Sequence, residues 1–132
     1  MGNDGKPREG DLSRRERQLL DALYRLGKAS AAEIREAVED PPTYTAVRTH
    51  LSNMEAKGFV KFESDGTRYI YEPAVPREEM AEAVMSNVME TFFDNRLELI
   101  VTSLISRKEA NVSQEQLDRL AEIIEEARRE GR

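Results

Sequence analysis

Three helical segments followed by a hairpin constrain the fold of the first half of this chain. Ser13 and Ser30 each precede a glutamate by three positions, which is the spacing of a capping box, and Thr43 stands where a third N-cap is expected. Hydrophobic residues at helical spacing follow each cap. Gly27 ends the first helix, two successive prolines end the second, and Gly58 closes the third. The pattern therefore predicts three short helices in succession.

Two stretches rich in aromatic and β-branched residues come next, over residues 59–63 and 68–72. The turn between them contains Asp65 and Gly66, a dipeptide that favours tight hairpins. Three helices and a hairpin, in this order, are the elements of a winged helix, a helix-turn-helix variant whose third helix enters the major groove of DNA. We therefore expect a winged helix-turn-helix in the N-terminal half.

A proline-bracketed segment, residues 73–76, separates this half from a second half that is helical in period throughout. The first ten residues are rich in Gly, Asp, Lys and Pro and have no periodicity. We therefore expect a disordered tail over residues 1–11, a winged-helix DNA-binding domain over residues 12–73 and a helical domain over residues 74–132.

The third predicted helix has an unusual outward side. Val47, Leu51 and Met54 recur on one side and form its core stripe. The opposite side carries small and hydroxyl-bearing residues, although 35% of the chain is charged and an ordinary solvated helix would expose Glu, Lys and Arg there. Small hydroxyl-bearing side chains allow a helix to lie deep in a groove and to contact phosphates or base edges. The alternative is that this side packs against another protein.

The predicted hairpin supports DNA binding only modestly. Its cations and tip hydroxyls could reach the DNA backbone, but Glu63 and Asp65 lie among them and would repel phosphate, so a solvated hairpin is at least as consistent with the charges. The complete set of expected DNA-binding residues is Thr43, Tyr44, Thr45, Arg48, Thr49, Ser52, Asn53, Lys61, Thr67 and Arg68.

The second half carries more large apolar side chains than three short helices can cover by themselves, and a second copy of the chain would cover them. The alternative is that these side chains fold back onto the first half. The expected dimerisation residues are Met80, Val84, Val88, Phe92, Phe93, Leu97, Ile100, Val101, Leu104, Leu117, Leu120 and Ile124. The expected fold class is thus mainly α, with an N-terminal winged helix-turn-helix (three helices plus a β-hairpin wing) followed by an α-helical dimerisation domain.

Composition excludes several classes of function. The chain has no cysteine and a single histidine, His50, so disulfides, thiol catalysis and Cys/His zinc sites are excluded. No nucleophile and base pair or phosphate loop is present, and we expect no catalysis, no cofactor and no metal. No apolar run approaches the length of a membrane span and no secretory signal precedes the first helix, so we expect a cytoplasmic protein without a membrane partner.

The formal net charge of -6 gives no support for a polyanionic partner by itself. Residues 1–76 carry 12 Lys and Arg against 13 Asp and Glu, a net charge of -1, whereas residues 77–132 carry 8 against 13, a net charge of -5. The acidity therefore lies mostly in the second half. A near-neutral first half can bind phosphate if its cations cluster on one face.

The third predicted helix also carries a family resemblance. Residues 44–49, with Leu51, Met54 and residues 57–60, resemble the recognition-helix signature of the penicillinase-repressor family of BlaI, MecI and CopY. The resemblance implies a winged-helix repressor that binds a palindromic double-stranded operator as a homodimer through its C-terminal helices. It places the DNA-contacting stretch on Thr43, Tyr44, Thr45, Arg48, Thr49 and Ser52. The alternative function is a winged-helix protein–protein interaction module without sequence-specific DNA binding.

Two departures from the family concern how repression would be relieved. Members released by a signalling protease are cut at an Asn-Phe bond, whereas the corresponding pair here is approximately Ile105 and Ser106, and Asn-Phe occurs nowhere in the chain. Copper-responsive members use a C-terminal cysteine motif, and this chain has no cysteine. The sequence therefore specifies neither the inducing signal nor a sensor protease, and it does not specify the operator or the regulated genes.

Overall fold

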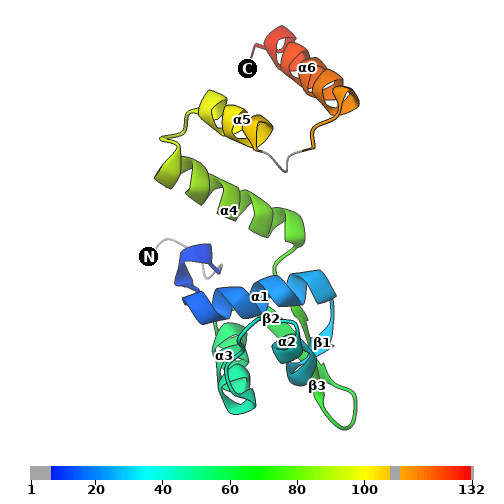
Figure 1. Cartoon of the computed structure of the whole chain (residues 1–132). Helices are drawn as coiled ribbons and strands as arrows, with labels where there is room; N and C mark the ends of the chain where they lie inside the picture. The colour runs from blue at the N-terminus through cyan, green and yellow to red at the C-terminus, as the bar shows by residue number, and fades with distance from the viewer. Residues whose placement is uncertain (1–6, 108–110, 132) are drawn as a thin grey trace. The chain divides into compact units, whose positions relative to one another are not determined.

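The computed structural model describes residues 7–107 and 111–131 (Figure 1). They form two compact units, which divide between Asn87 and Val88. The first unit contains the 3-10 helix η1 (Glu9–Asp11), α1 (Arg14–Leu26), β1 (Ala29–Ser30), α2 (Ala31–Glu36), α3 (Tyr44–Ala56), β2 (Val60–Ser64) and β3 (Tyr69–Pro73). Helix α4 (Arg77–Phe92) begins in the first unit and ends in the second, which also contains α5 (Leu97–Ser106) and α6 (Gln114–Arg129).

The three helices of the first unit begin at the residues that the sequence predicts. The side chains of Ser13 and Ser30 accept hydrogen bonds from the backbone N–H groups of Glu16 and Glu33, and both capping boxes are complete. Thr43 caps α3 by accepting a hydrogen bond from the N–H of Ala46. The predicted order of helix, helix, helix and hairpin is confirmed.

A third strand completes the sheet and was not predicted. β3 lies between β1 and β2, and both pairings are antiparallel, with Ala29 opposite Tyr71 and Phe62 opposite Tyr71. β1 has only two residues, and the second of them, Ser30, is also the N-cap of α2. A strand this short has no periodicity of its own, so only the backbone pairing with β3 identifies it.

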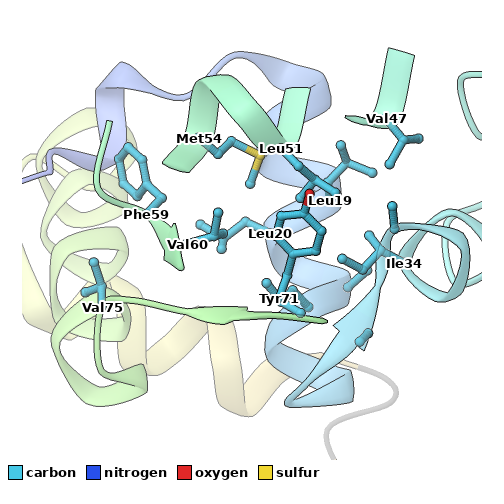
Figure 2. Close-up of a cluster of buried hydrophobic side chains, with 14 residues drawn as sticks. Leu19, Leu20, Ile34, Val47, Leu51, Met54, Phe59, Val60, Tyr71 and Val75 are labelled. Carbon is cyan, nitrogen blue, oxygen red and sulfur yellow. The ribbon is translucent and has the colours of Figure 1, made fainter. Parts of the chain in front are cut away.

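The hydrophobic core of the first unit lies between α1, α2, α3 and the sheet (Figure 2). The predicted stripe of α3, Val47, Leu51 and Met54, is fully buried. Leu19 and Leu20 of α1 belong to the same cluster, with further side chains from α2 and the strands. Because these residues bury one side of α3, its opposite side must face away from the core.

An ion pair joins the beginning of α1 to the end of α3. The carboxylate of Glu16, whose residue is 3% exposed, accepts a hydrogen bond from Lys57 Nζ at 2.7 Å and another from the N–H of Ser13 at 2.9 Å. Lys57 also donates to the carbonyl oxygen of Asp11. Burial raises the pKa of Glu16, but the hydrogen bonds from Lys57 and Ser13 and the charge of Lys57 together outweigh it, and the pKa is below its ordinary value.

Both ends of the predicted winged-helix domain differ from expectation. Residues 1–6 of the expected disordered tail lie outside the described residues, but Glu9–Asp11 form η1, and Glu9 is paired with Arg17. At the other end, Pro73 belongs to β3, and Val75 is 8% exposed within the core of the first unit (Figure 2). The compact units therefore divide later than residue 73, where the sequence places the boundary.

The second unit buries little of its apolar surface. Among its described residues, Ile100 is the one hydrophobic side chain that is buried. Exposed large apolar residues lie on all three of its helical segments, and they are Phe92, Leu97, Leu99, Val101, Leu104, Ile105, Leu117, Leu120, Ile123 and Ile124. None of the described helices combines the length and apolarity that crossing a membrane requires.

We expect Glu16→Gln to lower the free energy of unfolding by about 1–3 kcal/mol at neutral pH, because Lys57 loses its charged partner. The folded-state pKa of Glu16 is below its ordinary value of 4.5, so the stabilisation is fully present above that value and is lost as the pH falls through the folded pKa. Urea unfolding should therefore show a smaller difference between the two proteins at about pH 3 than at pH 7.

Glu36→Gln is the matched control, because Glu36 is an exposed carboxylate at the end of α2. It should leave the free energy of unfolding within about 0.5 kcal/mol of the original. Equal effects of the two substitutions would contradict a specific role for the pair.

Candidate nucleic-acid interface

The outward side of α3 is open to solvent along its length. Thr45, Arg48, Thr49, Ser52 and Asn53 are all exposed, as the helical spacing predicts, and no described segment covers them. Glu55 is an exception to the expected lack of carboxylates, because it is exposed and lines the groove beside the strands. The centre of the surface therefore carries mostly small polar side chains, and one acidic side chain lies at its edge.

The hydroxyl groups on this surface differ in what they can still contact. Thr49 Oγ1 donates to the carbonyl oxygen of Thr45, one helical turn earlier, at 3.1 Å. Its proton is used inside the helix, and its methyl group is the part of the side chain left for an outside contact. The hydroxyls of Thr45 and Ser52 have no hydrogen-bond partner among the described residues and remain free to donate.

Two adjoining hollows lie between α3 and the hairpin. The first, of about 340 Å³, is lined by Arg48, Arg68, Tyr44 and Thr67 together with the beginning of α2. The second, of about 470 Å³, lies between the exposed side of α3 and the strands. Arg48 lines both and forms no hydrogen bond or ion pair with a described residue. We call the two together the α3–wing groove.

Aromatic side chains form the strand side of this groove. Phe62 and Tyr69 are stacked with ring centroids 4.4 Å apart, and both rings lie near that of Tyr71. Burial raises the pKa of the Tyr71 phenol, while the positive charge of Arg48 opposes the shift. This cluster was not predicted from the sequence, although the hairpin register that places Phe62 opposite Tyr71 would have indicated it.

The wing tip is organised by one carboxylate. Asp65 accepts hydrogen bonds from the N–H and hydroxyl of Thr67 and from the N–H of Arg68 at 3.0–3.1 Å, and Arg68 Nε lies 3.5 Å from its other oxygen. These hydrogen bonds lower the pKa of Asp65 to about 2. Asp65 thus serves the turn and is paired with Arg68, which limits the phosphate repulsion expected from it. Lys61 remains an exposed cation without a hydrogen-bond or ion-pair partner in the described chain.

Arginines also fix the loop that leads into α3. Arg35 donates to the carbonyl oxygen of Pro42 at 2.7 Å, and Arg15 donates to that of Asp40 at 3.1 Å. Both guanidinium groups are used to hold this loop. They therefore add positive charge near the start of α3 without being part of its exposed side.

Most expected dimerisation residues are available for a partner, with two exceptions. Met80 packs against the core of the first unit, because α4 begins there, and Ile100 is buried within the second unit. Val84, Val88 and Phe93 are half-buried. The exposed members of the set are Phe92, Leu97, Val101, Leu104, Leu117, Leu120 and Ile124.

No metal site is found in the described part of the chain, where no three His, Cys, Asp or Glu side chains are grouped to hold an ion. His50 is half-buried beside the core stripe of α3.

The first unit has the three helices, the hairpin wing and the exposed third helix of a winged helix-turn-helix, a fold of DNA-binding regulators. The family model described as penicillinase repressor matches residues 12–126. The chain therefore belongs to the penicillinase-repressor family, which is a family of DNA-binding transcription repressors, and the resemblance carried by α3 is confirmed.

Solved structures similar to the chain include three bacterial proteins. A mutant of MepR from S. aureus is 15% identical with a TM-score of 0.49, over 94% of this chain and 83% of that one. BpsR from Bordetella bronchiseptica, described with regulation of its DNA binding by 6-hydroxynicotinic acid, is 14% identical with a TM-score of 0.48, over 89% and 76%. A MarR family regulator from Silicibacter pomeroyi is 14% identical with a TM-score of 0.45, over 93% and 74%. Among curated proteins, none matches the chain.

We expect Asp65→Ala to loosen the wing tip, so that backbone amides of residues 66–68 exchange with solvent faster, while the thermal unfolding temperature changes little. Asp65→Asn keeps an oxygen acceptor and should retain most of the turn. Since the pKa of Asp65 is lowered from 3.8 to about 2, the carboxylate should hold the tip as the pH falls through 3.8 and release it only near 2. Amide exchange followed by NMR measures both effects.

Glu63→Ala removes a neighbouring carboxylate of the same hairpin and should leave exchange at the tip unchanged. Unchanged exchange in Asp65→Ala as well would show that the turn does not depend on this carboxylate.

Proposed function

We propose that this chain represses transcription by binding a palindromic DNA operator as a homodimer, with α3 in the major groove. The observation that carries the proposal is the exposed side of α3, where Thr45, Arg48, Thr49 and Ser52 are all open to solvent. The side chains of Thr45, Thr49 and Ser52 are small, and they allow the helix backbone to approach base edges closely. Family membership supports repression, and the arrangement of the site supports the way in which DNA would be bound.

Each side chain of the surface has a role that its remaining chemistry allows. Arg48 has no hydrogen-bond or ion-pair partner among the described residues, so its donors can reach a guanine edge or a phosphate. Thr45 and Ser52 can donate to phosphates or base acceptors, and the Thr49 methyl can pack on a thymine methyl. Lys61 and Arg68 on the wing would contact the backbone beside the groove. Base contacts thus come from α3, and the wing supplies positioning contacts.

The homodimer rests on the second unit. Ile100 is the one hydrophobic side chain buried among the described residues of this unit, so most of their apolar surface is left in water, at a cost of roughly 25 cal/mol per Å². A second copy presents an identical apolar surface, so a two-fold arrangement covers both at once. Such a dimer would carry two α3 helices, which can read successive major grooves about 34 Å apart.

A protein-interaction module is the second candidate function. Its support is the acidic balance of the chain, the exposed Glu55 at the edge of the α3 surface and the exposed Glu63 on the wing. The two functions differ in their dependence on salt. Binding to DNA releases counterions, so log K should fall by about 0.9 per phosphate contact for each tenfold rise in salt.

The proposed function is tested by selecting duplexes from a random-sequence pool with the full chain and titrating the enriched duplex at several salt concentrations. We expect a palindromic sequence and a steep salt dependence. Arg48→Ala should weaken binding to that duplex by about 1–3 kcal/mol without changing the mass of the dimer in solution. Arg25→Ala, which removes an exposed cation on α1, is the control and should change affinity much less.

Failure to enrich any duplex, or an affinity independent of salt, would contradict DNA recognition and favour the interaction module. Equal losses in Arg48→Ala and Arg25→Ala would contradict the assignment of Arg48 to a specific contact.

For the dimer, Phe92→Asp is the informative change, because Phe92 is 75% exposed at the end of α4 and a carboxylate there could not be buried in an apolar interface without a large cost. We expect monomers in sedimentation experiments and at least a tenfold loss in affinity for the palindromic duplex. The N-terminal unit should keep its fold, as judged by the NMR signals of its core methyl groups.

Ser86→Asp introduces the same charge at an exposed polar position of α4 and should leave the dimer intact. A dimer that persists in Phe92→Asp would show that the interface does not include this side chain.

A further inference from the structure

The connection between β3 and α4 is bound to α1 by three contacts. The hydroxyl of Tyr24 donates to the carbonyl oxygen of Val75 at 2.6 Å. The guanidinium of Arg77 donates to the carbonyl oxygen of Tyr24 at 2.6 Å and lies 5.9 Å from the centre of the Tyr24 ring. We call Tyr24, Val75 and Arg77 the α1–α4 clasp. It joins residues more than fifty positions apart in the sequence.

A backbone hydrogen bond and buried apolar side chains stabilise the chain on both sides of the clasp. The N–H of Ala74 donates to the carbonyl oxygen of Phe59, the Val75 side chain is buried in the core, and Met80 packs against the same core one turn into α4. Burial raises the pKa of the Tyr24 phenol, with Arg77 opposing the shift, so the phenol stays protonated and able to donate. The proline-bracketed segment is therefore an anchored corner of the first unit.

We propose that the α1–α4 clasp is a positioning device that fixes the direction in which α4 leaves the winged helix, and thereby determines which spacing of operator half-sites the dimer accepts. This inference rests on the proposed function. Arg77 and Tyr24 are positioning residues, because neither lies on the exposed side of α3 or lines the α3–wing groove.

Small changes of direction have large effects at the far end of the helix. The part of α4 that belongs to the first unit, residues 77–87, is about 16 Å long at 1.5 Å per residue. A tilt of about 15° at the clasp would displace its end by about 4 Å, which exceeds the rise of about 3.4 Å per base pair. Without a fixed clasp, the position of one recognition helix relative to the other half-site would thus vary by about one base pair.

The first test compares three kinds of duplex, all derived from the sequence that the full chain selects: the palindrome, a single half-site, and palindromes with one or two base pairs added or removed at the centre. The variant is Tyr24→Phe combined with Arg77→Gln, which removes the hydroxyl donor of Tyr24 and the guanidinium of Arg77 and keeps the aromatic ring. Arg25→Gln is the matched control, since it removes a neighbouring charge on α1 outside the clasp.

We expect the clasp variant to bind the single half-site as the original chain does, to lose about tenfold in affinity for the palindrome, and to discriminate less between spacings. Arg25→Gln should behave like the original. A parallel loss on the half-site and the palindrome, or an unchanged preference for spacing, would overturn the proposal. If the original chain bound no DNA, the proposed function would have failed first, and the next measurement would decide on the clasp.

The second test needs no DNA. The chain has no cysteine, so spin labels can be attached at cysteines introduced for Glu36 in α2 and Glu82 in α4, both exposed, in full-length protein diluted with an excess of unlabelled chain. We expect a narrow distance distribution that broadens in the double variant and, to a smaller degree, in Tyr24→Phe alone. A distribution already broad in the original chain, or one that the variants leave unchanged, would overturn the proposal.

Discussion

The packing of α3 against α1 is the constraint on which the rest of the first unit depends. Val47, Leu51 and Met54 are buried in the core, and this fixes the rotation of α3 about its own axis. Its two ends are fixed by polar contacts, with Thr43 capping the start and Lys57 bound to Glu16 at the end. Core packing thus fixes the rotation of α3, and separate polar contacts fix its two ends. A helix held in this way presents Thr45, Arg48, Thr49 and Ser52 as a rigid surface, which is what sequence-specific contacts require.

Local signals made much of this predictable from sequence. Capping boxes act within three residues, and helical periodicity shows which side of a helix is buried, so the start of α1 and α2 and the outward side of α3 could all be inferred. The Asp-Gly dipeptide likewise located the wing. These inferences succeeded because each depends on neighbours close in the chain.

Contacts between distant segments could not be predicted in the same way. The strand β1 exists only through its pairing with β3, and Met80 belongs to the core of the first unit because the connection before it is bound to α1. Nothing in the periodicity of α4 distinguishes Met80 from the apolar residues that follow it. Only the α3 side of the α3–wing groove was predicted, because helical spacing identifies its hydroxyl-bearing residues and Arg48. The strand side was not, because the stacking of Phe62 and Tyr69 depends on strand register.

Net charge was a poor guide to this molecule, because many charges are used internally. Glu16 and Asp65 are engaged by backbone N–H groups and by cations, and Arg35 holds a loop carbonyl. What an outside partner meets is the charge left over at each surface, which includes Arg48 on α3 and Lys61 on the wing, with Glu55 at the edge of the α3–wing groove. A total of -6 is therefore compatible with a local surface that attracts phosphate.

The second unit has few buried side chains, and Ile100 is the one buried hydrophobic residue among those described there, so the proposed dimer would make repression depend on the amount of protein. If pairing supplies most of the stability of that unit, its order rises with the number of copies in the cell. At low concentration the chain would then be degraded by quality-control proteases before it could bind its operator. At high concentration dimerisation would protect it. Repression would accordingly depend on the expression level of the chain.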